Sequence, residues 1–410
     1  MVKEFFKVTN LASVLARVAE FPLVGMETIP LTTSAGRILA EDITTDHDLP
    51  AFSRSTMDGY AVQAASTFGA SESSPAYLMV KDTVYMGVPP TFSIGPGEAA
   101  RISTGGMLPQ GSDGVVMIEH ADKLDESTIE VYRSVAPGRN VIEKGEDFRQ
   151  DQIILRSGQL LRPQETGLLA AFGHKVARVF KRPVIAIISS GDEIVPVDAT
   201  PAPGQIRDIN SYTLSGLVTT AGGIPVHYGI VPDSYDALFQ TCQEALVQSD
   251  MVLLSGGSSV GTRDFTVDVL TNLAASQILV HGISISPGKP TILAKTNAKA
   301  LWGLPGHVVS AMVVFRIVVQ PFIARISGMT LSTHPPITIP ARLTRNIEST
   351  QGRTDFVRVR LEQKNGGYRA EPILGKSGLL NTMVLADGLI EIDAHTEGLD
   401  AGTTVAVMPF

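Results

Sequence analysis

The stretch "MVLLSGGSSVGTRDF" (251–265) decides the fold. It begins with a short apolar run, continues through glycines and serines, and ends near an acidic residue that can open a helix. Small side chains leave backbone N–H groups uncovered, which serves to hold an anion or to turn the chain sharply. The stretch therefore predicts a strand, a loop of one of these two kinds, and a helix, in that order.

The residues before this stretch repeat the pattern of strand and helix. Apolar runs at 184–188 and 251–254 are typical of strands covered on both faces, and 224–231 reads as a strand between them. This alternation predicts a doubly wound parallel sheet. In the first intervening helix we expect a cap at Asp208 or Asn210 and an end at Gly222 and Gly223. The face of this helix that packs on the sheet is expected to consist of Leu214, Leu217, Val218 and Ala221. In the second helix the corresponding face is expected to consist of Leu238, Thr241, Cys242, Ala245 and Leu246.

Three polar loops leave these strands at the same end. They are "SSGDE" (189–193), "VPDS" (231–234) and "SGGSSVGTRD" (255–264). Ligands of open α/β sheets bind beyond the carboxyl ends of the strands. We therefore expect the polar residues of the three loops to converge, although they are far apart in the sequence.

The fold class expected for the whole chain is multidomain α/β. A central doubly wound parallel-sheet domain is flanked by mixed α+β N-terminal domains and a small C-terminal all-β domain, because alternating segments such as "DFVRVRLEQ" dominate the last part of the chain. The expected boundaries are 1–45 with 146–180 for a discontinuous dimerisation or linker domain, 46–145 for a mostly β domain, 181–328 for the α/β domain and 335–410 for the β domain.

Composition excludes several classes of protein. The 410 residues carry a formal net charge of −8 without a basic stripe, so nucleic-acid binding is not expected. Cys242 is the only cysteine, which rules out an intrachain disulfide and a cysteine-rich zinc site. The N-terminus lacks a signal-peptide pattern, and polar residues interrupt the apolar segment 308–326. We expect a cytoplasmic protein whose segment 308–326 is a buried helix.

The loop after residue 254 matches one known catalytic device in part. Its spacing fails the Walker and dinucleotide patterns, but 257–261 fits the nucleophile elbow G-x-S-x-G around Ser259. A serine hydrolase also needs an acid and then a histidine downstream, and residues 269–306 contain no Asp or Glu. The hydrolase is therefore the minor hypothesis, beside a plain tight turn.

Neighbouring motifs favour an anion site. Lys289 lies on the turn "SPGKPT" (286–291), and "GLPGH" (303–307) leads into the next helix, whose first amides attract anions. The carboxylates of Glu193, Asp233 and Asp264 suit a hard divalent cation that bridges to such an anion. Each acid alone is more often a cap or a solvated charge.

The order of further motifs resembles one family. "STMDGYAV" (55–62), "ISTGGMLPQGSDGVVM" (102–117), "GRNVIEKGEDF" (138–148), "GQIRDIN" (204–210) and "GLPGHVVSAMVVF" (303–315) follow one another as in the molybdopterin molybdenumtransferases, the MoeA family, to which the gephyrin E domain is related. The resemblance covers essentially the whole chain.

The resemblance implies a function and an assembly. Members insert molybdate into adenylated molybdopterin and release AMP with the help of a divalent cation, usually Mg²⁺. The implied assembly is a homodimer, with molybdopterin adenylyltransferase and apo-molybdoenzymes as partners and no membrane. Residues carried over as catalytic are Asp58, Glu193, Asp233, Asp264 and Lys289, with Glu193, Asp233 and Asp264 also as metal ligands. Residues carried over as cofactor-binding are Thr104, Gly256, Gly257, Ser258, Ser259, Gly288, Pro290, Pro305, Gly306, Arg358 and Thr382; Ser377 is named as an alternative to Thr382.

Two positions depart from the family pattern. Ser286 stands where Lys or Arg is common, and Lys144 stands where Arg is frequent, so one cation and one bidentate fork are missing. A tungstate-inserting variant is therefore an open hypothesis. Two further hypotheses for the function are a molybdopterin adenylyltransferase and a non-catalytic pterin-binding scaffold.

Overall fold

The chain forms two compact units in a computed structural model. The described residues are 8–256, 265–330, 337–364 and 366–410. The first unit comprises Met1–Glu41, Ser157–Gly167 and Lys175–Phe410, and the second comprises Asp42–Arg156 and Leu168–His174. This division is coarser than the four domains expected from the sequence, whose boundaries remain a prediction.

A six-stranded sheet forms the centre of the first unit. Its strand order is β16-β13-β17-β21-β20-β18. The first four strands are parallel, as predicted, whereas β20 and β18 pair antiparallel at one end. The bounds are β13 (Val184–Ser190), β16 (Ile224–Val231), β17 (Met251–Ser255), β18 (Ser276–His281), β20 (Ile292–Thr296) and β21 (Lys299–Leu304).

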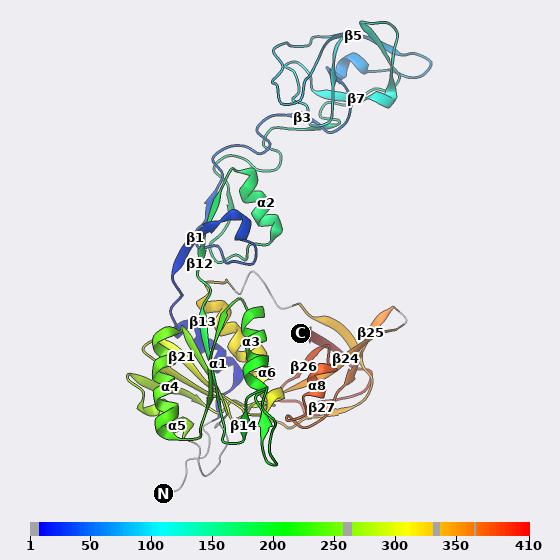
Figure 1. Ribbon diagram of the computed structural model, residues 1–410. Helices are drawn as coiled ribbons and strands as arrows, with labels where there is room; N and C mark the ends of the chain where they lie inside the picture. The colour runs from blue at the N-terminus through cyan, green and yellow to red at the C-terminus, as the bar shows by residue number, and fades with distance from the viewer. Residues whose placement is uncertain (1–7, 257–264, 331–336, 365) are drawn as a thin grey trace. The chain divides into compact units, whose positions relative to one another are not determined.

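Helices cover both faces of this sheet. Ile185 and Ile187 pack in one hydrophobic cluster with residues of α3 and α6, while Ala186 and Ile188 pack in another with residues of α4 and α5. Alternate residues of a strand point to opposite faces, so one strand feeds both clusters. Figure 1 shows the two helix layers on opposite sides of the sheet, which confirms the doubly wound architecture. The bounds are α3 (Asn210–Thr220), α4 (Tyr235–Gln248), α5 (Thr266–Asn272) and α6 (Val308–Val314).

The apolar segment after β21 is a core helix. It runs from α6 through a π-helical turn (Phe315–Val319) into α7 (Gln320–Ile326). Among the described residues, this helix alone is long and apolar enough to cross a membrane, but 61% of it is buried inside the protein. Phe322 meets the edge of Trp302, the only tryptophan of the chain, with ring centroids 5.0 Å apart. The segment is buried as the sequence analysis predicted.

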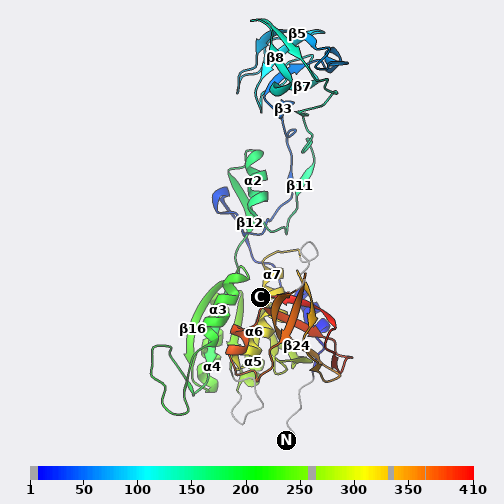
Figure 2. The same cartoon turned by 90° about the vertical axis from the view of Figure 1, so that its right-hand side faces the viewer.

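The C-terminal part of the first unit is a small closed β structure. Its strands follow the order β24-β25-β22-β28-β26, and β26 pairs again with β24. From the central region, β19 (Ile285–Ser286) adds parallel to β24. Figure 2 shows β24 beside the α6–α7 segment. The bounds are β22 (Ile339–Leu343), β24 (Thr354–Lys364), β25 (Gly367–Pro372), α8 (Asn381–Val384), β26 (Gly388–Ile392) and β28 (Thr404–Pro409), with the short pair β23 (Ile347–Glu348) and β27 (Gly398–Leu399).

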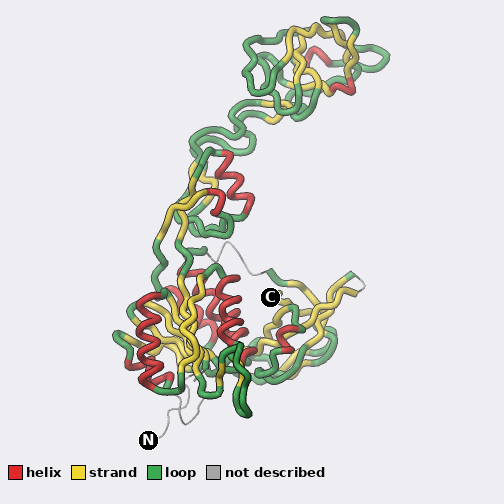
Figure 3. Tube along the Cα trace, in the orientation of Figure 1, coloured by secondary structure: helices red, strands yellow, loops and turns green. Residues whose placement is uncertain are grey.

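The second unit is mostly β structure. Its sheet has the order β7-β4-β6-β5-β9-β8 around a core that includes Val62, Leu78 and Val116. Figure 3 shows mainly strands and loops in this unit. The sheet bounds are β4 (Gly59–Val62), β5 (Ala76–Thr83), β6 (Glu98–Ile102), β7 (Gly114–Met117), β8 (Ala121–Lys123) and β9 (Thr128–Val131).

Short elements complete the chain. In the first unit α1 (Leu11–Ala16) packs on the central core, and β1 pairs antiparallel with β12. The remaining bounds are β1 (Met26–Pro30), β2 (Ile43–Thr44), β3 (Arg54–Ser55), β10 (Val141–Ile142), β11 (Ile153–Leu155), α2 (Pro163–Ala171), β12 (Val176–Phe180), β14 (Ile194–Val195) and β15 (Ile206–Arg207).

Candidate active site

A large cleft lies where the central sheet of the first unit meets the C-terminal barrel. Its volume is about 1110 Å³, and both domains contribute to its lining. The sheet side consists of the loops that follow β13, β16, β17 and β21, at the carboxyl ends of the parallel strands. The sequence-predicted residues that line it are Glu193, Asp233, Gly256, Gly288, Lys289, Pro290, Pro305, Gly306 and Arg358, together with Ser377 and Ser286.

The loops after β13 and β16 are tied to each other. The Ser190 hydroxyl donates a short hydrogen bond to Oδ1 of Asp233, and the Asp233 backbone N–H donates to Oδ1 of Asp192 at 3.1 Å. These bonds hold the Asp233 carboxylate at the cleft, while Glu193 stays exposed on the neighbouring loop. Two of the three predicted metal ligands therefore share one wall.

Gly256 opens the glycine-serine loop under a strict steric limit. Its φ is +108°, and a Cβ there would lie 2.1 Å from the carbonyl oxygen of Ser190. Only glycine allows this approach of β17's end to the end of β13. Four predicted site residues lie outside the described residues: Gly257, Ser258, Ser259 and Asp264. The hydrolase hypothesis, which depends on Ser259, therefore stays a prediction.

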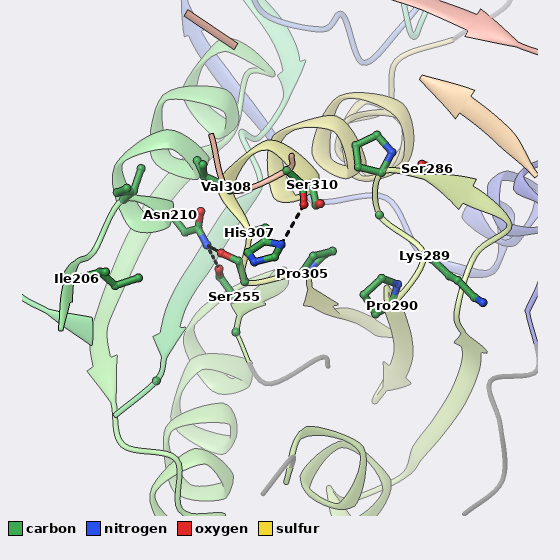
Figure 4. Close-up of a pocket in the computed structure, with 18 of the residues that line it drawn as sticks. Ile206, Asn210, Ser255, Ser286, Lys289, Pro290, Pro305, His307, Val308 and Ser310 are labelled. Carbon is green, nitrogen blue, oxygen red and sulfur yellow. Dashed lines mark hydrogen bonds between the residues drawn. The ribbon is translucent and has the colours of Figure 1, made fainter. Parts of the chain in front are cut away.

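The turn that carries Lys289 is fixed by its backbone. The Thr291 hydroxyl donates to the Gly288 carbonyl at 2.6 Å, and the Lys289 carbonyl accepts from Ile283 N–H at 2.9 Å. A Cβ on Gly288 would meet the Val314 side chain at 2.4 Å. Lys289 itself is exposed, and Figure 4 shows its ammonium pointing away from Ser255. The turn is thus rigid while the charge remains free to reorient.

Arg358 is the buried cation of the barrel wall. It is only 6% exposed, and its guanidinium donates to the Ile373 carbonyl and, at 3.0 Å, to the Gly375 carbonyl. Burial lowers the pKa of Arg358 from its ordinary value. A strand residue could instead point outward, but this one faces the cleft. No described carboxylate pairs with it, so an anion in the cleft is its natural partner.

Three further positions named in the sequence analysis, Thr382, Ser286 and Lys144, have the following contacts. Thr382 is buried outside the cleft lining, and its hydroxyl donates to the Leu379 carbonyl at 2.7 Å, so it supports the loop that carries Ser377. Ser286 lies opposite Asp355 in the β19–β24 register. In the second unit, the Lys144 ammonium lies 3.5 Å from Oδ2 of Asp48.

Asp58 and Thr104 meet in the second unit. The Thr104 backbone N–H and hydroxyl donate to Oδ1 of Asp58 at 2.7 and 3.2 Å. Both residues remain exposed. The structure therefore brings these two predicted residues together, 46 positions apart in the chain.

Asn210 and His307 were missed as cleft residues. Asn210 was considered only as a helix cap, yet its Nδ2 donates to Ser255 Oγ at 2.6 Å and to the Gly306 carbonyl at 2.8 Å, as Figure 4 shows. Nδ1 of His307 lies 2.9 Å from Ser377 Oγ. Their places in "GQIRDIN" and "GLPGH" were the available signals.

Comparisons with known proteins match most of the chain. Residues 8–173 match the MoeA N-terminal region (domain I and II), 186–325 match a probable molybdopterin binding domain, and 340–410 match the MoeA C-terminal region (domain IV). A molybdopterin molybdenumtransferase of Bacillus subtilis is 34% identical, covering 96% of this chain and 92% of its own. The chain belongs to the MoeA family.

Solved structures of MoeA proteins share this fold. A molybdopterin biosynthesis MoeA protein from Pyrococcus horikoshii matches with a TM-score of 0.80 and 38% identity, covering 98% of this chain and 99% of its own. A second structure of that name from the same organism matches with a TM-score of 0.85 and 30% identity, covering 98% and 100%. Family membership confirms the resemblance inferred from the motifs.

Proposed function

We propose that this MoeA-family protein is a transferase that inserts molybdate into adenylated molybdopterin, releases AMP and forms the molybdenum cofactor. One observation carries the proposal: Asp233, Gly256 and Lys289, from separate loops of the sheet domain, line one cleft with Arg358 from strand β24 of the barrel. The names of the relatives agree with this activity.

The cleft residues suit two anionic substrates. The backbone N–H of Gly306, at the start of the loop into α6, is a donor for phosphate oxygens. The buried Arg358 and the movable Lys289 supply positive charge for molybdate and for the oxygens that gain charge when the phosphoanhydride breaks.

We propose Glu193 and Asp233, together with Asp264, as the residues that hold Mg²⁺. Oxygen donors are what this hard cation prefers, and both described carboxylates line the cleft on adjacent loops. The described residues alone contain no group of three or more His, Cys, Asp or Glu side chains that could hold a metal. When bound, the cation would neutralise phosphate charge during cleavage.

Reconstituted transfer tests the proposal. With adenylated molybdopterin, molybdate and Mg²⁺, the protein should release AMP, measured by chromatography, and Asp264→Ala should abolish this release without unfolding the protein. Glu193→Gln and Asp233→Asn should slow it at least about tenfold. Asp400→Asn, an exposed acid outside the cleft, is the matched control. Wild-type protein that releases no AMP refutes the proposal.

The same assay separates the competing functions. Consumption of Mg-ATP with free molybdopterin would identify an adenylyltransferase, and binding without either reaction would identify a scaffold. Ser286 favours a test of tungstate, since a neutral hydroxyl stands in the cleft where the family commonly has a cation. Competition between the two oxyanions decides that point, and a clear molybdate preference ends the tungstate hypothesis. Labelling of Ser259 by a fluorophosphonate would revive the hydrolase.

We also propose a cytoplasmic homodimer in which Asp58 and Thr104 take part in substrate binding. The proposed partners are molybdopterin adenylyltransferase and apo-molybdoenzymes. Sedimentation equilibrium tests the dimer, and a monomer at all concentrations would contradict it.

A further inference from the structure

Two acceptor groups stand in the cleft wall at the start of α3, and neither belongs to the anion-binding set. Asp208 and Asn210 both line the cleft, and each is only 8% exposed. They lie in the motif "GQIRDIN", beside donors that suit phosphate and oxyanion. Hydrogen-bond acceptors do not bind an anion, so these two groups are expected to bind a part of the ligand that carries N–H donors.

Asp208 uses only one of its carboxylate oxygens within the protein. Its Oδ1 accepts from the Ser189 hydroxyl at 3.0 Å and from the Ser211 backbone N–H at 3.1 Å. The bond from Ser211 caps the first turn of α3, and the bond from Ser189 ties Asp208 to the end of β13. Oδ2 has no hydrogen-bond donor, and no Lys, Arg or His pairs with the carboxylate, among the described residues. Buried carboxylates are normally paired or fully hydrogen-bonded, so Oδ2 is available for a ligand.

Asn210 also has a side-chain oxygen without a hydrogen-bond donor. Its Nδ2 donates to both Ser255 Oγ and the Gly306 carbonyl, and this second bond fixes the amide orientation, because a flipped amide would set two carbonyl oxygens against each other. Its Oδ1 is buried and has no hydrogen-bond partner. In Figure 4 this oxygen is turned away from Ser255. A buried acceptor without a donor is rare in native structures and points to a missing ligand group.

We propose that Asp208 and Asn210 recognise the N–H edge of the substrate's pterin. This inference rests on the proposed function, which brings a pterin into the cleft. A pterin presents an amino group next to a ring N–H, and this pair of donors suits two acceptors that come from residues two positions apart in the cleft wall, one of them charged. Adenine, the second heterocycle of the substrate, presents an amino group beside ring acceptors and fits less well. The phosphates and molybdate then occupy the donors of Lys289 and Arg358.

Calorimetric titration with two matched probes tests the proposal. Pterin carries the amino group beside its ring N3–H, whereas lumazine carries a carbonyl oxygen in place of the amino group and a hydrogen on N1, and keeps N3–H. Wild-type protein should bind pterin at least about tenfold more tightly than lumazine, as expected for a hydrogen bond to a charged group. Equal affinities, or no pterin binding, would overturn the proposal.

Asp208→Asn is a nearly single-atom test. The amide oxygen can keep the bonds from Ser189 and Ser211, so the new NH₂ group replaces Oδ2 alone. Pterin affinity should fall at least about tenfold and the preference for pterin should vanish, because a donor now faces the amino group. Unchanged preference would overturn the proposal.

Ser189→Ala separates recognition from support. Ser189 is fully buried, does not line the cleft and loses only its bond to Asp208 and its contact with the Ser211 hydroxyl. This variant should melt at a lower temperature but keep the wild-type ratio of pterin to lumazine affinity; the same loss of ratio as in Asp208→Asn would make the effect structural and sink the inference. AMP release by the same wild-type preparation tells the two proposals apart. If the protein releases AMP but shows no preference for pterin, only the inference about Asp208 and Asn210 is wrong. If it releases no AMP, the proposed function is wrong.

Discussion

Nδ1 of His307 lies 2.9 Å from Oγ of Ser377, and this contact joins the sheet wall of the cleft to the barrel wall. A second bond supports it, since the Val309 N–H donates to the Ser377 carbonyl. The loop that carries Ser377 is therefore held against the start of α6, and the width of the cleft depends on this junction.

His307→Ala should slow AMP release while leaving the fold intact. The side chain is exposed, so the lost hydrogen bond costs about 1 kcal/mol of stability at most, but a displaced Ser377 loop should lower the rate about tenfold. Initial rates and melting temperature check this. His395→Ala removes a histidine outside the cleft and should behave as wild type; a His307→Ala rate equal to wild type would show that the junction does not matter.

Gly256→Ala should unfold or inactivate the protein, because the new Cβ would overlap the Ser190 carbonyl. Gly204→Ala is the matched comparison, as Gly204 also has a positive φ, +89°, but nothing lies within 4 Å of its Cβ position. The control should cost about 1 kcal/mol from backbone strain alone, and Gly256→Ala about 3 kcal/mol or more. Urea unfolding of both variants measures the difference, and equal costs would contradict the steric argument.

Arg358→Met should weaken molybdate binding about tenfold or more, because a charge-assisted bond is lost. Stability should stay within about 1 kcal/mol of wild type, since relief of the buried charge offsets the lost bonds to the Ile373 and Gly375 carbonyls. Equilibrium dialysis with molybdate measures the first effect. Arg360→Met, an exposed arginine on the same strand, should bind normally. Normal binding by Arg358→Met would remove Arg358 from the oxyanion site.

Glu165 should make stability depend on pH in the acid range. Its hydrogen bonds with the Arg162 side chain, more than the bond from the Arg162 backbone N–H, lower the pKa of Glu165. The stabilisation is therefore complete above the unfolded pKa of about 4.3 and is lost as the pH falls through the lower folded pKa. Glu165→Gln should cost about 1 kcal/mol at neutral pH and less below about pH 4. Urea titrations across this range check it, with Glu397→Gln as the control outside this ion pair; a constant difference would contradict it.

Local patterns predicted the parallel part of the central sheet. Short apolar runs such as 184–188 and the stripe of Leu214 and Val218 are set by burial on both faces of one element, which sequence periodicity records directly. The antiparallel end was not predicted. Strand direction at β18 and β20 depends on how the chain returns across the sheet, and no residue within those strands encodes it.

The sequence predicted the part of the site that strand order alone brings together. Asp233 and Gly256 follow strands whose ends necessarily meet at one edge, so their convergence followed from topology. Asn210 was missed because its partner Gly306 is 96 residues away, and a cap and a cleft residue look alike in sequence. For Thr382, the hydroxyl bond to Leu379 depends on a turn that periodicity does not reveal.

Trp302 is an intrinsic fluorescent probe that reports on the first unit alone. This single indole stands in the core of the central sheet, and the second unit contains none. Its fluorescence therefore follows the integrity of the first unit and is silent when only Asp42–Arg156 loses structure. Two transitions in far-ultraviolet circular dichroism and one in tryptophan emission would be the signature of units that melt independently.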